Sequence, residues 1–176
     1  LALALFAPIS KLYDEGRMEE VKNHLSYCLK YYLVVTIPFV FGAGILAKPI
    51  LTLYSTQAIA DEGRYILPVL SLAVVFLGVN TIIYHILLLA KRTRLLSLIW
   101  IGAAVLNLGL NVVFIPRIGV MGAASTTLFA YAVALGLTAY YSYKELRFNM
   151  HWASLFKSIG ASLIMSLVIW ALAYWQ

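Results

Sequence analysis

An uncharged stretch near the middle of the chain reads Tyr65-ILPVLSLAVVFLGVNTIIYHILLL-Ala90. None of its 26 residues is Asp, Glu, Lys or Arg. A helix needs about 20 mostly apolar residues to cross the hydrocarbon core of a bilayer, which is roughly 30 Å thick. Because the stretch meets this requirement, we predict a membrane-spanning helix over residues 65–90.

Four other stretches have the same character: residues 31–54, 95–115, 119–143 and 158–175. Lys48, the one charged residue in the first of them, lies near its end, where its long side chain can reach the headgroups. Residues 1–13 have the character of the end of a further membrane helix. The connections 91–94 and 116–118 are short, which makes the helices they join antiparallel neighbours. The expected fold class is all-α: a polytopic membrane helix bundle with five full transmembrane helices plus the end of a sixth.

The composition of the 176 residues supports this class. Hydrophobic residues make up 63% and charged residues 11%, against about 45–50% and about 25% in soluble domains. The mean hydropathy of +0.91 agrees. These values exclude an ordinary soluble enzyme, a disordered protein and, despite the net charge of +6, a nucleic-acid binder. With Cys28 as the single cysteine, the chain has no disulfide framework.

The cationic residues predict how the helices are oriented. Ten of the thirteen Lys and Arg residues fall in segments 11–30, 91–94 and 144–157, which the predicted helices place on one side. Only Lys48, Arg64 and Arg117 fall on the other. Since cytoplasmic loops carry the excess of Lys and Arg, we expect the first three segments to be cytoplasmic and the protein to lie in the cytoplasmic membrane. Within residues 14–30, apolar residues recur at helical spacing from Met18 to Leu29, which predicts an amphipathic helix on the inner membrane surface.

The polar residues do not form a catalytic constellation. All seven acidic residues lie in predicted loops, and the three histidines lack the spacing of metal ligands. We therefore expect no enzyme activity, no catalytic residue, no cofactor and no metal site. Polar groups at membrane depth are costly unless they are paired or face a cavity. The candidates for a cavity or gate are Thr36, Pro38, Asn80, His85, Asn107 and Asn111.

Spacing and chemistry separate these candidates. Asn107 and Asn111 are four residues apart and share a helix face, where they either bond a neighbouring helix or line a cavity. Asn80 and His85 are five apart, about 140° around the helix, so they do not share a narrow face. Pro38 kinks the first span, either statically or as a hinge, and Thr36 is placed to bond a backbone group that the proline frees.

Three segments together resemble a known family. The first is Asn107-LGLNVVFIPRIGVMGAAST-Thr127, with two asparagines four apart, an Ile-Pro turn and Gly-x-x-Gly-Ala-Ala. The second is residues 8–16, followed by a helix with Ile37-Pro38, and the third is Leu87-LLA-Lys91. This order resembles the polysaccharide and O-antigen flippases of the oligosaccharidyl-lipid exporter superfamily. The resemblance implies a transporter of two lobes that works by alternating access. Residues 1–13 would end a truncated helix, 14–30 would be the cytoplasmic linker, and 31–176 would form five helices of the second lobe.

The function that this resemblance implies is translocation of a polyprenyl-pyrophosphate-linked oligosaccharide for polysaccharide biosynthesis. The partners would be that substrate, membrane lipids and an N-terminal lobe of the same chain, without nucleic acid. A cation-coupled multidrug exporter is an alternative, although the predicted spans lack the buried carboxylate that such coupling usually uses. An integral-membrane glycosyl or acyl transferase and a scaffold protein are further alternatives.

Overall fold

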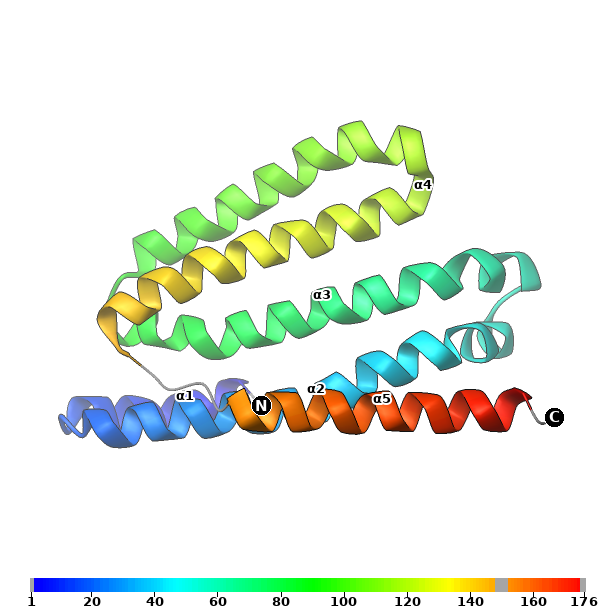
Figure 1. The fold of residues 1–176 in the computed structure, drawn as a ribbon. Helices are drawn as coiled ribbons and strands as arrows, with labels where there is room; N and C mark the ends of the chain where they lie inside the picture. Colours follow the sequence, from blue (N-terminus) through cyan, green and yellow to red (C-terminus); the bar gives the residue numbers. More distant parts are fainter. Residues whose placement is uncertain (1, 148–151, 175–176) are drawn as a thin grey trace.

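The computed structural model describes residues 2–147 and 152–174. Residue 1, residues 148–151 of the predicted loop 144–157, and residues 175–176 lie outside the described part. Five helices follow one another in the described part (Figure 1): α1 Ala2–Asp14, α2 Met18–Tyr54, α3 Gln57–Leu89, α4 Thr93–Glu145 and α5 Trp152–Tyr174. The predicted all-α class is confirmed. Helices α2, α3 and α4 are each long and apolar enough to cross a membrane, while α5 contains a shorter apolar helical part, Phe156–Ile169.

Helix α4 folds back on itself, so its 53 residues form a hairpin (Figure 1). The chain reverses at Ile118 and Gly119, where Gly119 has φ 61° and ψ −144°. A side chain would clash in this conformation, and glycine, which has no Cβ, adopts it readily. The reversal separates a first arm, 93–117, from a second arm, 120–145. Pro116 remains helical at the end of the first arm, so the reversal begins slightly later than the predicted connection 116–118.

The predicted amphipathic stretch within residues 14–30 does not form a helix of its own. It is the first part of α2, which continues as a helix from Met18 through Pro38 to Tyr54. The chain turns at Gly16, with φ 74°, and this turn brings α1 back against α2. Val21 and Leu25 are then buried in a core that contains Ile9 of α1 and residues of α3. An apolar helical stripe fits a protein core as well as a lipid surface, and the apolar residues Val21 and Leu25 of this stripe face the core.

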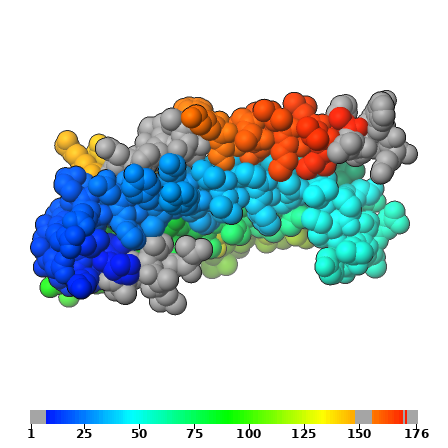
Figure 2. All heavy atoms as spheres, turned by 90° about the horizontal axis from the view of Figure 1, so that it is seen from below, coloured from blue at the N-terminus to red at the C-terminus, as the bar shows by residue number. Residues whose placement is uncertain are grey.

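Helix α3 is the centre of the bundle. It packs against α2 on one side and against α4 on the other, while α5 packs against α2. Figure 2 shows α5 lying along α2, and the last part of α1 on the opposite side of α2. The main core joins α1, the first half of α2 and the second half of α3. A smaller core joins the end of α3 to both arms of α4, around Leu87, Ile99 and Ala134.

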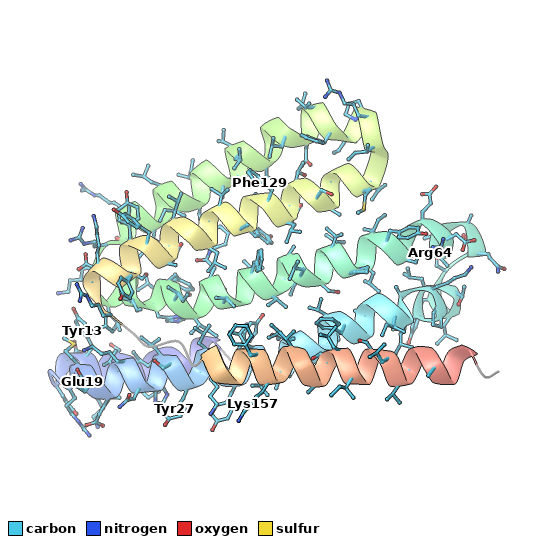
Figure 3. All side chains as sticks on the ribbon, in the orientation of Figure 1. Tyr13, Glu19, Tyr27, Arg64, Phe129 and Lys157 are labelled. Atoms are coloured by element: carbon cyan, nitrogen blue, oxygen red, sulfur yellow. The ribbon has the colours of Figure 1, made fainter. Side chains whose placement is uncertain are left out.

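Charged side chains lie near the two ends of the bundle. Figure 3 shows Tyr13 and Glu19 near one end and Arg64 at the other. At the end with Arg64, Lys48 Nζ lies 2.7 Å from Asp61 Oδ1 and joins α2 to α3. At the opposite end, Arg92 Nε lies 2.7 Å from Glu145 Oε1. These ion pairs join chain segments where charged groups can remain hydrated.

Candidate functional site

Pro38 marks a weak point in the backbone hydrogen bonds of α2. A proline has no N–H, so the carbonyl four residues earlier, that of Val34, loses its helical donor. Thr36 does not replace that donor, because its hydroxyl donates instead to the carbonyl of Tyr32, at 2.8 Å. The hydroxyl of Ser158 on α5 donates to the carbonyl of Val34, at 3.4 Å. The interrupted position in α2 is therefore a contact point with α5.

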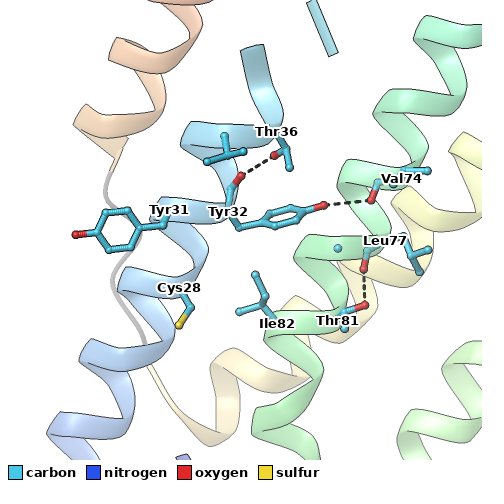
Figure 4. A pocket seen from close by; sticks show the side chains of 10 residues that line it. Cys28, Tyr31, Tyr32, Thr36, Val74, Leu77, Thr81 and Ile82 are labelled. Atoms are coloured by element: carbon cyan, nitrogen blue, oxygen red, sulfur yellow. Dashed lines mark hydrogen bonds between the residues drawn. The ribbon is translucent and has the colours of Figure 1, made fainter. Parts of the chain in front are cut away.

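Tyr32 joins α2 to α3 a short distance before the proline. Its hydroxyl donates to the carbonyl of Val74 at 3.3 Å, and its ring extends from α2 towards α3 (Figure 4). The ring occupies the space that the missing side chain of Gly78 leaves open. A Cβ on Gly78 would lie 1.9 Å from the Tyr32 hydroxyl oxygen. The close approach of α2 and α3 thus depends on glycine at this position.

A groove of about 610 Å³ runs between α2 and α3 beside this contact (Figure 4). Its walls are mostly apolar and include Val35, Val74, Leu77 and Ile82. Of the six candidates for a cavity or gate, Thr36 alone lines this groove. The groove has the size of a ligand pocket, but it has few polar groups to bind a sugar or a pyrophosphate.

Asn80 and His85 are both buried on α3, at 1% and 4% exposure. Within the described part of the chain, the Asn80 Oδ1 atom accepts no hydrogen bond, and the buried hydroxyl of Thr138 on α4 has no hydrogen-bond partner. His85 Nδ1 lies 2.7 Å from the carbonyl oxygen of Thr81, one turn earlier on its own helix. The two candidates thus have different surroundings. His85 bonds its own backbone, whereas the side-chain carbonyl of Asn80 remains unsatisfied within the bundle.

Asn107 and Asn111 connect the two arms of α4. The side-chain amide of Asn111 donates to Asn107 Oδ1 at 3.1 Å. The Thr126 hydroxyl donates to Asn111 Oδ1, and the Asn107 amide donates to the Thr127 hydroxyl at 3.4 Å. The sequence left two interpretations of this pair: hydrogen bonds to a neighbouring helix, or the wall of a cavity. The structure contains hydrogen bonds between the two arms. Such a network satisfies polar groups that would be costly at membrane depth.

Sequence reasoning missed several of the residues that complete these sites. Ser158 is far from Val34 in the sequence, and nothing near either residue indicates their contact. Thr126 and Thr127 were detectable in principle. In a hairpin that reverses near residue 118, residues equally far before and after the reversal lie opposite each other, which places these threonines near the two asparagines.

The described residues do not suggest a metal centre. Residues 2–147 and 152–174 contain no group of three His, Cys, Asp or Glu side chains that could hold a metal ion. Five of the acidic side chains are instead paired with Lys or Arg near the ends of the helices: Glu15, Glu19, Glu20, Asp61 and Glu145. The Arg17 side chain donates to Glu20 and Glu15 outside the apolar part of α2, and these carboxylates raise the pKa of Arg17 above its ordinary value.

The fold is similar to that of a solved transporter. The chain superposes on a structure described as lipid II flippase MurJ, inward closed conformation, with a TM-score of 0.79. The superposition covers 97% of this chain and 37% of that chain, at 23% sequence identity. At this level of identity the similarity shows a common fold.

Two curated archaeal proteins are similar in sequence. The probable low-salt glycan biosynthesis flippase Agl15 of Haloferax volcanii is 25% identical over 173 residues, covering 96% of this chain and 35% of that protein. An uncharacterized membrane protein of Methanocaldococcus jannaschii is 27% identical over 130 residues, covering 73% of this chain and 25% of that protein. The chain thus spans about a third or less of the length of these relatives.

The family comparison covers the complete sequence. The family described as lipid II flippase MurJ matches residues 1–176. Together with the relatives and the fold, this match confirms the resemblance to flippases of lipid-linked oligosaccharides and identifies a multi-pass membrane protein. The chain belongs to the MurJ family of lipid II flippases.

Proposed function

We propose that the chain is part of a transporter that moves a polyprenyl-pyrophosphate-linked oligosaccharide from the inner to the outer leaflet of the cytoplasmic membrane. The observation that carries the proposal is the match of the whole chain to a flippase family. The name of the haloarchaeal relative, a probable glycan biosynthesis flippase, supports a lipid-linked glycan as the substrate class. The transporter carries its substrate between leaflets without making or breaking covalent bonds in it.

In this proposal the membrane is crossed five times: by α2, by α3, by each arm of α4 and by α5. The first arm of α4 supports this arrangement, because large apolar side chains recur along it at helical spacing and are at least 60% exposed: Leu98, Ile101, Val105, Leu108 and Val112. Such a continuous apolar stripe is unfavourable in water and favourable against lipid or another membrane helix.

The proposed orientation places the beginning of α2 and the turn between α3 and α4 in the cytoplasm. Figure 1 shows these two segments at one end of the bundle, with the reversal of α4 at the other. The cytoplasmic end then contains Arg92 and Arg94, and the outer end contains Arg117. This distribution agrees with the excess of Lys and Arg expected in cytoplasmic loops.

We assign the moving part of this portion of the transporter to α2 at Pro38. Pro38 removes one backbone hydrogen bond of α2, and α5 replaces the donor through Ser158. A helix that lacks one internal hydrogen bond bends there at lower cost. Because α5 packs against α2, a bend at Pro38 changes the relative position of the two helices.

The test is translocation by the full-length protein in lipid vesicles. Vesicles receive a fluorescent polyprenyl-pyrophosphate oligosaccharide or lipid II, and a reagent outside the vesicles measures how much reaches the exposed leaflet. The proposal predicts transport of at least one of these two donors, and their relative rates identify the substrate. A failure to transport either donor, while the protein exports a cationic drug, would favour the multidrug-exporter alternative.

A further inference from the structure

The interface between α3 and the second arm of α4 contains two buried polar atoms that lack hydrogen bonds. Asn80 Oδ1 on α3 and Thr138 Oγ1 on α4 have no hydrogen-bond partner among the described residues. Both residues are almost completely buried, at 1% and 0% exposure. Buried polar groups in proteins are nearly always bonded, either to another protein group or to an ordered water molecule. The two atoms therefore indicate a polar site inside the bundle.

Asn80 and Thr138 lie at nearly the same level of the bundle. Helix α3 and the second arm of α4 lie side by side and run in the same direction (Figure 1). The Ser142 hydroxyl donates to the carbonyl of Ile83 at 3.3 Å, which fixes how these two segments are aligned. Thr138 is four residues before Ser142, and Asn80 is three residues before Ile83, which are axial steps of about 6 Å and about 4.5 Å. The two unpaired atoms thus belong to the same layer of the interface.

Thr138 does not use its hydroxyl within its own helix. The hydroxyls of Thr81 and Thr127 each donate to the carbonyl four residues earlier, which is a common bond for threonine in a helix. The Thr138 hydroxyl makes no such bond to Ala134. One turn to either side of Thr138, the second arm has only the small buried side chains of Ala134 and Ser142. These side chains fill little of the interface beside the hydroxyl.

We infer that an ordered water molecule binds between Asn80 and Thr138 and joins α3 to the second arm of α4. The Thr138 hydroxyl donates to the water oxygen, and the water donates to Asn80 Oδ1, so both atoms gain a partner. Two polar partners are enough to hold a buried water molecule. A cation is disfavoured at this site, because residues 65–90 and 120–144 contain no Asp or Glu that could balance its charge.

A structure of the full-length protein at a resolution that shows ordered water tests the inference. The expected result is a water peak within about 3.2 Å of both Asn80 Oδ1 and Thr138 Oγ1. The control is the pair Asn111 and Thr126 in the same map, which bond directly and should have no water between them. The inference is overturned if no peak lies between Asn80 and Thr138, or if the peak has the several short oxygen contacts of a cation.

Matched substitutions provide a second, independent test in the full-length protein. Thr138→Val and Asn80→Leu should each lower the unfolding temperature, because each leaves the water and the other side chain with one partner fewer. The double variant should lose less than the sum of the two shifts, since it removes the polar atoms and the water together. Thr52→Val is the control, because the Thr52 hydroxyl bonds its own helix, and its effect should add to that of Asn80→Leu. Additive losses for Asn80→Leu and Thr138→Val would contradict a shared water.

Discussion

The hydroxyl of Ser158 lies 3.4 Å from the carbonyl oxygen of Val34, the carbonyl that Pro38 leaves without its helical donor. The two residues are 124 positions apart in the sequence and belong to α5 and α2. The contact links a defect in one helix to the placement of another. It also accounts for the burial of a hydroxyl group, since Ser158 is 7% exposed.

The Ser158 contact predicts an energetic coupling with Pro38. In the full-length protein, Ser158→Ala should lower the free energy of unfolding by about 1 kcal/mol, because the Val34 carbonyl then lacks a donor. In a Pro38→Ala background the new N–H of residue 38 bonds that carbonyl, and the cost of Ser158→Ala should fall towards zero. Thermal unfolding of the four proteins measures the coupling.

Ser71→Ala is the control for this double-mutant comparison. The Ser71 hydroxyl donates to the backbone carbonyl of Leu67 within its own helix, at 2.8 Å. Its effect on stability should be the same with proline or alanine at position 38. An equal cost of Ser158→Ala in both backgrounds would show that the two helices are not coupled through the Val34 carbonyl.

Gly78→Ala should destabilise the protein by about 1–3 kcal/mol, as overpacking commonly does. The added Cβ would lie 1.9 Å from the Tyr32 hydroxyl oxygen, so the ring would have to leave its place between α2 and α3. The matched variant is Gly102→Ala on α4, where a Cβ meets no atom within 4 Å. There the substitution should be neutral or stabilising, because alanine favours a helix over glycine by about 1 kcal/mol. Equal melting temperatures for the two variants would refute the role assigned to Gly78.

The network in α4 predicts that Asn111 and Thr126 act as a unit. Asn111→Ala and Thr126→Ala should each destabilise the hairpin, and the double variant should cost less than their sum by about 0.5–3 kcal/mol. The control is Ser125→Ala, since the Ser125 hydroxyl donates to Met121 on its own arm, at 2.9 Å. Its effect should add to that of Asn111→Ala. Strict additivity for Asn111 and Thr126 would mean that the hydrogen bond between the arms contributes nothing.

The orientation predicts opposite accessibility for two exposed arginines. In a background without other cysteines, Arg117→Cys should react with a membrane-impermeant maleimide added to intact cells. Arg94→Cys should react only after the cells are permeabilised, because it lies at the cytoplasmic end. The reverse pattern would invert the assigned orientation, and labelling of both sites from outside would remove the membrane crossing between them.

The helices were largely predictable from the sequence, because length and apolarity are local properties. The predicted span 65–90 ends one residue after α3, which begins eight residues earlier, at Gln57. The reversal of α4 lies at the end of the predicted connection 116–118. The continuity of α2 from Met18 to Tyr54 was not predicted. The charges before residue 31 suggested a separate helix, but a change of composition along a helix does not interrupt its backbone hydrogen bonds.

The contacts between helices were much less predictable. That Asn107 and Asn111 share a face follows from their spacing, and their bonds to Thr126 and Thr127 follow once the position of the reversal is known. The insertion of Tyr32 at Gly78 depends on how α2 and α3 cross. No periodicity in either segment specifies that crossing.

The most direct test of the account is the initial rate at which a labelled polyprenyl-pyrophosphate oligosaccharide or lipid II reaches the opposite leaflet of vesicles that contain the full-length protein. The account predicts that the rate for at least one of the two donors rises in proportion to the amount of protein and exceeds the rate in protein-free vesicles. Rates equal to those of protein-free vesicles for both donors, from a protein that remains folded and inserted, would contradict it.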